Sequence, residues 1–98
     1  MLVGNLRLIT ADLSAIILTD PLRIRWLVDY GNIDIICYSA IGKHPAIRVI
    51  NRLGLAGHIE EITTDPWTTK IDHKELNKTI TLLCFRQVAK ALRWDLHR

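Results

Sequence analysis

The chain has 98 residues, of which 49% are hydrophobic and 23% are charged, and its formal net charge is +3. This length suits one domain, and this composition is typical of a folded protein and excludes a disordered chain. The longest apolar runs, Ala15–Leu18 and Leu82–Phe85, are far shorter than the roughly 20 residues that a membrane span needs. Asn5, Arg7 and Asp12 interrupt any secretory hydrophobic segment, so we expect an intracellular, cytoplasmic protein.

Two helices are expected in the first third of the chain. Apolar residues recur at helical spacing from Asn5 to Leu18, which favours a helix over 5–18, although the abundant isoleucine would also allow a pair of strands. Asp20 and Pro21 then predict the start of a second helix, because Asp20 can cap it and proline suits the first helical position. This second helix is expected to run to about Tyr30 and to end at the glycine that follows.

The segment 33–41 is ambiguous from its local pattern. Its sequence, IDIICYSAI, is rich in β-branched residues and could form a buried strand of an α/β domain. It is also long enough for two helical turns that would place Ile33, Ile36, Cys37 and Ile41 on one face. Local pattern leaves both possibilities open.

A basic amphipathic helix is expected next, over 44–54. Ala46, Ile50 and Leu53 form its inward stripe, and glycines 54 and 57 end it. The following residues alternate, turn at an Asp-Pro pair and return, which predicts a small hairpin over 58–72.

The range 74–96 predicts a long C-terminal helix whose apolar residues cover more than one face. A surface helix of so small a domain needs only one apolar stripe, so the extra apolar side is expected to pack against a second copy of the chain. The expected dimer interface consists of Leu76, Ile80, Leu83, Cys84, Val88 and Leu92.

Taken together, these elements resemble the winged helix-turn-helix fold, and most closely the small ArsR-like transcriptional repressors. TDPLRIRWLVDYG (19–31) is similar to a helix of that family, and IICYSAIG (35–42) stands where the family has the first helix of its helix-turn-helix. KHPAIRVINRLGLAGHIEEI (43–62) is similar to the recognition helix, the Ala-Gly pair and the first wing strand. The resemblance covers roughly residues 5–96 and favours a helix at 33–41.

The resemblance implies one winged-helix domain over 1–98, mainly α with a small β-hairpin wing. Residues 44–54 would be the recognition helix, 58–72 the wing and 74–96 the dimerisation helix. The implied function is sequence-specific binding of double-stranded DNA by a homodimeric transcription regulator of the repressor type. Its operator would be near-palindromic, with half-sites about 10 base pairs apart.

The expected DNA contacts lie mostly on the basic helix. Arg48 and Asn51 are of the types that pair with guanine and adenine edges, whereas cations at the groove edges reach phosphates. The full expected set is Lys43, His44, Ile47, Arg48, Asn51, Arg52, Arg23, Arg25 and Lys70. Glu60 and Glu61 count against this interpretation, because they put negative charge at the base of the wing.

Two other classes of function stay open. A winged-helix module that binds protein instead of DNA would share the fold. A small α/β enzyme would use LRLIT, SAIIL and DIICY as strands, but the sequence has no glycine-rich phosphate loop and no recognisable catalytic residues, so no enzyme and no cofactor are predicted. No metal site is predicted, because Cys37 lacks the neighbouring cysteine that metal-sensing members of the family use; Cys84 is expected in the dimer core.

Overall fold

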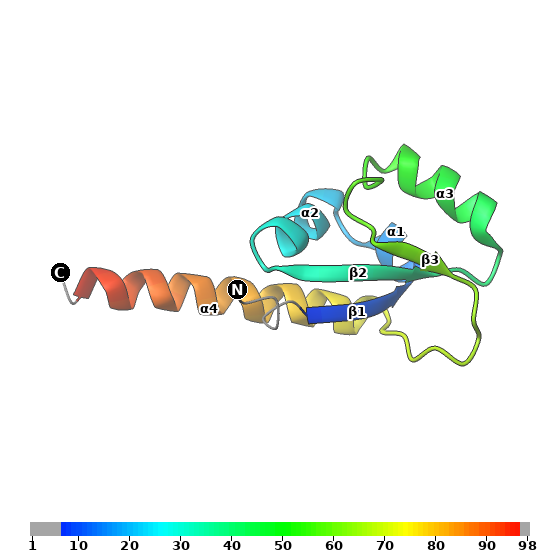
Figure 1. Cartoon of the computed structure of the whole chain (residues 1–98). Helices are drawn as coiled ribbons and strands as arrows, with labels where there is room; N and C mark the ends of the chain where they lie inside the picture. Colours follow the sequence, from blue (N-terminus) through cyan, green and yellow to red (C-terminus); the bar gives the residue numbers. More distant parts are fainter. Residues whose placement is uncertain (1–6, 97–98) are drawn as a thin grey trace, which may run out of the picture.

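A parallel β-sheet carries the helices of this protein (Figure 1). The computed structural model describes residues 7–96, and it describes side chains as far as Arg93. In chain order the elements are β1 (Arg7–Asp12), α1 (Leu13–Leu18), α2 (Pro21–Asp29), β2 (Ile33–Tyr38), α3 (Lys43–Arg52), β3 (Glu61–Thr63) and α4 (His73–Leu96).

The sheet has three strands in the order β1-β2-β3, and both neighbouring pairs are parallel. The first pair is in register from Arg7 opposite Ile33 to Asp12 opposite Tyr38. Parallel neighbours need a long crossover, which α1 and α2 provide for the first pair and α3 provides for the second. A single parallel bridge between Ala11 and Ile71 brings the chain back to the free side of β1 before α4 begins.

The expected winged helix-turn-helix fold is therefore wrong. A wing needs two antiparallel strands that hydrogen-bond to each other. In the range 58–72, β3 instead pairs parallel with β2, while Ile71 forms a bridge to β1, the strand at the opposite edge of the sheet. The segment 33–41, expected as a helix, contains the central strand β2. The segment expected as one helix over 5–18 splits into β1 and α1, with residues 5 and 6 outside the described range.

The faces of the sheet explain why β2 is a strand. Residues paired in a parallel register point to the same side, so Ala11, Ile33, Ile35 and Cys37 share one face. All four are at most 1% exposed, and they belong to one core with buried residues of all four helices. One face of β2 is thus buried, and its alternation is weak in the sequence because Ile36, on the other face, is apolar as well.

The opposite face of the sheet is covered less. By the same register it carries Leu8, Thr10, Asp34 and Ile36, none of which is buried. Near the carboxyl ends of the strands, Tyr38 is covered, with the Lys70 Nζ 3.8 Å from the centroid of its ring. The helices therefore form a single layer on one side of the sheet.

The first residues of helices α2 and α3 agree well with those predicted from the sequence. The Asp20 side chain accepts a hydrogen bond from the Leu22 amide at 2.9 Å, so α2 begins as predicted, with Pro21 in its first turn. Before α3, Gly42 has φ +100°, a conformation that favours glycine. Ala46 and Ile50 face the core, which confirms the predicted inward stripe of α3.

Helix α4 belongs to the core only along its first half. Leu76 is 0% exposed and Ile80 is 3% exposed. From Cys84 to Arg93 every side chain is exposed, and this half of the helix projects away from the sheet (Figure 1). The dimensions of the molecule, 51 × 28 × 22 Å, reflect this projection.

Candidate functional site

The predicted DNA contacts divide into two groups in the structure. Those on α3 lie together on its outer side, where all are exposed: Lys43, His44, Ile47, Arg48, Asn51 and Arg52. No acidic residue occurs between positions 43 and 59, but Glu61 of β3 lines a hollow together with Lys43, Ile47 and Asn51 of this helix.

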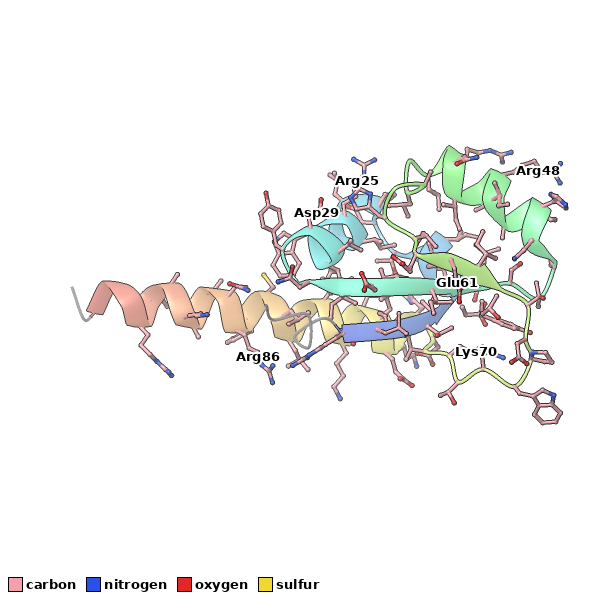
Figure 2. All side chains as sticks on the ribbon, viewed as in Figure 1. Arg25, Asp29, Arg48, Glu61, Lys70 and Arg86 are labelled. Atoms are coloured by element: carbon pink, nitrogen blue, oxygen red, sulfur yellow. The ribbon has the colours of Figure 1, made fainter. Side chains whose placement is uncertain are left out.

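The other three predicted contacts lie outside α3; two of them, Arg25 and Lys70, are labelled in Figure 2. Arg25 donates a hydrogen bond to the Gly54 carbonyl at 3.3 Å, which places it beside the end of α3. Arg23 instead donates to Thr81 Oγ1 of α4 at 3.2 Å. Lys70 lies over the Tyr38 ring and belongs to no wing. The structure thus brings Arg25 near the basic helix and leaves Arg23 and Lys70 away from it.

The residues predicted for the dimer interface also divide. Leu76 and Ile80 are core residues of the single chain, with 0% and 3% of their surface exposed, and Leu83 is partly buried against the same core. In contrast, Cys84 is exposed, and Val88 and Leu92 are 54% and 59% exposed. The expected interface therefore has to be corrected, because half of it packs inside its own molecule.

Sequence reasoning missed part of the apolar surface. Phe85 is 74% exposed and Leu82 is 54% exposed, although both lie in the most apolar run of the helix. On α2, Leu22 is 67% exposed. The signal for α4 was present, since Leu82, Phe85 and Leu92 recur at helical spacing, but only the structure shows which side of this helix faces outward.

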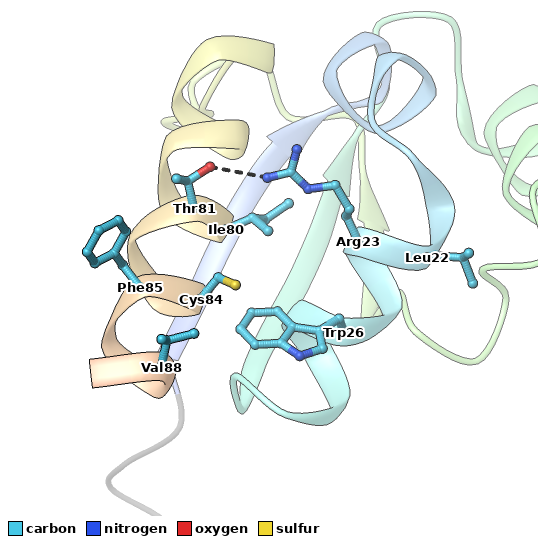
Figure 3. A pocket seen from close by; sticks show the side chains of 8 residues that line it. All are labelled: Leu22, Arg23, Trp26, Ile80, Thr81, Cys84, Phe85 and Val88. Carbon is cyan, nitrogen blue, oxygen red and sulfur yellow. Dashed lines mark hydrogen bonds between the residues drawn. The ribbon is translucent and has the colours of Figure 1, made fainter. Parts of the chain in front are cut away.

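A groove between α2 and α4 connects these residues (Figure 3). Its volume is about 560 Å³, which is within the usual range for ligand pockets. Its lining is mostly apolar and consists of Leu22, Arg23, Trp26, Ile80, Thr81, Cys84, Phe85 and Val88. The hydrogen bond from Arg23 to Thr81 crosses one end of the groove and joins its two sides.

The carboxyl edge of the sheet is the place where α/β proteins commonly bind ligands. Here its polar side chains form local turns and caps. The Asp12 carboxylate accepts from Ser14 N and Oγ at 3.2 and 3.1 Å, and the Asp72 carboxylate accepts from the Glu75 amide at 2.9 Å. Ser39 Oγ donates to the Gly42 carbonyl at 2.9 Å. These contacts assign a structural role to each of the three side chains.

Within residues 7–93, no buried side-chain nitrogen or oxygen lacks a hydrogen-bond partner. The same part of the chain contains no group of three or more His, Cys, Asp and Glu residues that could hold a metal ion. Among the described residues the carboxyl edge therefore offers no buried unpaired polar atom on which to build a ligand site, and the α2–α4 groove is the better candidate.

The two cysteines are free and lie in opposite environments. Burial, together with the negative charge of Asp12, raises the pKa of the Cys37 thiol from 9.0 to about 11. Cys37 is fully buried on the helix-covered face of β2, whereas Cys84 is exposed on the α4 side of the groove. Cys84 is thus the thiol that a reagent in solution reaches.

Comparisons of the chain with protein-family models, curated proteins and solved structures give no match. The ArsR-like resemblance thus gains no support from relatives, and the fold that it implied is not the fold observed. Among the described residues, no helix combines the length and the apolar character that crossing a membrane would require.

Proposed function

We propose that this chain is a protein-interaction module that binds through the α2–α4 groove and the exposed stripe of α4. The observation that carries the proposal is a series of large exposed apolar side chains: Leu22 on one side of the groove, Phe85 and Val88 on the other, and Leu92 one turn further along α4, all between 54% and 74% exposed. Isolated exposed apolar residues are ordinary, but a contiguous patch beside a groove is typical of a binding surface.

The projecting half of α4 gives a second reason. In proteins most helical stability comes from packing an amphipathic face, and isolated helices shorter than about 12–15 residues are marginal in water. From Cys84 onward α4 is of that length, and every side chain described on it, up to Arg93, is exposed. A partner that covers the apolar stripe would supply the missing contacts.

This proposal replaces the expectation of a sequence-specific repressor. The recognition helix, the wing and the operator spacing were implied by a winged helix, and the parallel sheet removes that basis. We also propose a cytoplasmic location, which is supported by two free cysteines, because a reducing compartment keeps thiols unpaired. We propose no catalytic activity.

Photo-crosslinking from the groove tests the proposal. Benzoylphenylalanine in place of Phe85 is expected to give a discrete protein adduct in cells that make the chain. The matched control is benzoylphenylalanine in place of Trp67, an aromatic residue that is 90% exposed and does not line the groove. Equal crosslinking from both positions, or none from either, would contradict a binding surface on α4.

A second candidate function is binding of duplex DNA through α3, and one observation favours it. The outer side of this helix exposes Arg48 and Arg52 with Asn51 between them, and Arg25 lies beside its end. Such a surface would bind mainly through phosphates, so its affinity should be modest and should fall steeply with salt.

Fluorescence anisotropy with a short duplex at several salt concentrations tests this candidate. Replacing Arg48 and Arg52 by alanine should lower the salt slope by about one for each phosphate that the variant no longer neutralises. The matched control removes two exposed cations of α4, Arg86 and Lys90. If the α4 variant weakened binding as much as the α3 variant, attraction by net charge would explain the data and the α3 assignment would be wrong.

A further inference from the structure

We infer that the occupant of the α2–α4 groove is a second copy of this chain, packed about a twofold axis. The inference rests on the proposed function and adds the identity of the partner. One helix carries both surfaces that the inference needs: Ile80, Cys84, Phe85 and Val88 line the groove, and Leu92 continues the apolar stripe on the half of α4 that projects from the domain.

A twofold axis would bring the groove of each copy against the projecting half of α4 of the other copy. In an isologous interface each molecule offers the same surface, so a groove in one copy must be filled by something that the other copy also carries. With the two α4 helices antiparallel and the axis near Cys84 and Val88, Leu92 of each copy reaches the Ile80 end of the partner's groove. The projecting half of each helix then covers the groove of the other.

The charges on α4 permit this pairing. At 3.6 residues per turn, Arg86, Lys90 and Arg93 fall on the side of α4 opposite to the groove-lining residues Cys84 and Val88. Figure 2 shows Arg86 directed away from α2 and α3. Two copies can therefore meet along the apolar side while these three cations of α4 stay in water, and the cation that lines the groove, Arg23, has a hydrogen-bond partner in Thr81 of its own chain.

The other apolar surface of the chain does not have this property. The open face of the sheet mixes Leu8 and Ile36 with the carboxylates of Asp34 and Glu61, so two such faces would bring like charges together. This face supplies the control position. Leu8 is 61% exposed, which is close to the exposure of Val88.

Sedimentation velocity over a concentration series tests the inference. The wild-type chain is expected to shift with concentration toward twice its mass of 11.2 kDa. Val88→Lys should raise the dimer dissociation constant about 30-fold or more, as for a residue at the centre of an interface. Leu8→Lys should leave it unchanged. Circular dichroism of both variants confirms that they fold, since both residues are more than half exposed.

Crosslinking at Cys84 tests the position of the proposed twofold axis. A short bis-maleimide should join the two exposed Cys84 thiols of a dimer, while Cys84→Ser should abolish the product and the buried Cys37 should contribute none. Dimers that form without this crosslink would refute the proposed axis.

The outcomes separate this inference from the proposed function. Suppose that the chain stays monomeric at every concentration, while benzoylphenylalanine at position 85 gives an adduct heavier or lighter than a dimer. This result would refute the inference that the partner is a second copy, but it would support the proposal that the chain is an interaction module. A monomeric chain with no adduct overturns both. An adduct of twice the chain mass, absent in Val88→Lys, supports both.

Discussion

Two leucines of α4 provide a matched test of which side of this helix belongs to the core. Leu76 is 0% exposed and Leu82 is 54% exposed, and they lie six residues apart on the same helix. The substitutions Leu76→Ala and Leu82→Ala remove the same atoms from the same kind of backbone. Any difference in the free energy of unfolding therefore reports burial alone.

The expected magnitudes differ severalfold. Leu76→Ala leaves a cavity in a closed core and should cost about 3 kcal/mol, within the range of about 2–5 kcal/mol for such changes. Leu82→Ala removes side-chain carbon that is less than half buried, at about 0.8 kcal/mol per fully buried methylene, so it should cost roughly 1 kcal/mol or less. A chain of this length has a total stability of about 5–15 kcal/mol, so only the first change threatens the fold.

Urea unfolding followed by far-ultraviolet circular dichroism measures both changes. With a slope of about 1.5 kcal/mol per molar urea, Leu76→Ala should lower the midpoint by about 2 M and Leu82→Ala by less than about 0.7 M. The protein must be dilute, because a dimer would add stability that depends on concentration. Equal midpoints for the two variants would refute the orientation of α4 and, with it, the exposed apolar stripe.

Three further predictions concern the rest of the fold. A Cβ at Gly31 would lie 2.5 Å from the Leu27 carbonyl oxygen, so Gly31→Ala should destabilise the folded chain by about 1–3 kcal/mol. A Cβ at Gly57 would meet no atom within 4 Å, so Gly57→Ala should change the stability by less than about 0.5 kcal/mol, and thermal unfolding of the two variants measures the difference. Asp20→Ala removes the cap of α2 and should cost about 1 kcal/mol, measurable in the same way. The pKa of Cys37 is raised to about 11, so the folded chain keeps a proton that the unfolded chain loses above pH 9, and stability should fall as the pH rises from 9 toward 11. Urea unfolding at about pH 8 and about pH 10 should show a smaller fall for Cys37→Ala, and an identical fall would contradict the assignment.

Local sequence patterns correctly predicted those features of the structure that depend only on residues close together in the chain. The start of α2 follows from Asp20 and Pro21, whose capping interaction spans two residues. The extents of α3 and α4 agree with the predicted helices to within about two residues, because amphipathic periodicity is written along each segment. The outward cationic side of α3 follows from the same periodicity.

Long-range pairing explains the errors. Arg7 and Ile33 are partners in the sheet although 26 positions separate them, and nothing in either segment identifies the other. Ile33–Tyr38 has the composition of a strand and a spacing that a helix can also use, and it became a strand because β1 and β3 lie on its two sides. The short run 61–63 suggested a hairpin, but its partner is the buried central strand and not residues 68–72.

The candidate surface shows the same division between local and tertiary information. The sequence by itself determined that α4 is a long helix with more apolar side chains than one core can use. Only the tertiary structure decided which of them are buried inside the molecule, since Leu76 and Ile80 meet residues from β1, α1 and α2 that lie more than forty positions away. Periodicity along a helix records that a face is apolar, whereas the choice of what covers that face depends on how distant segments pack.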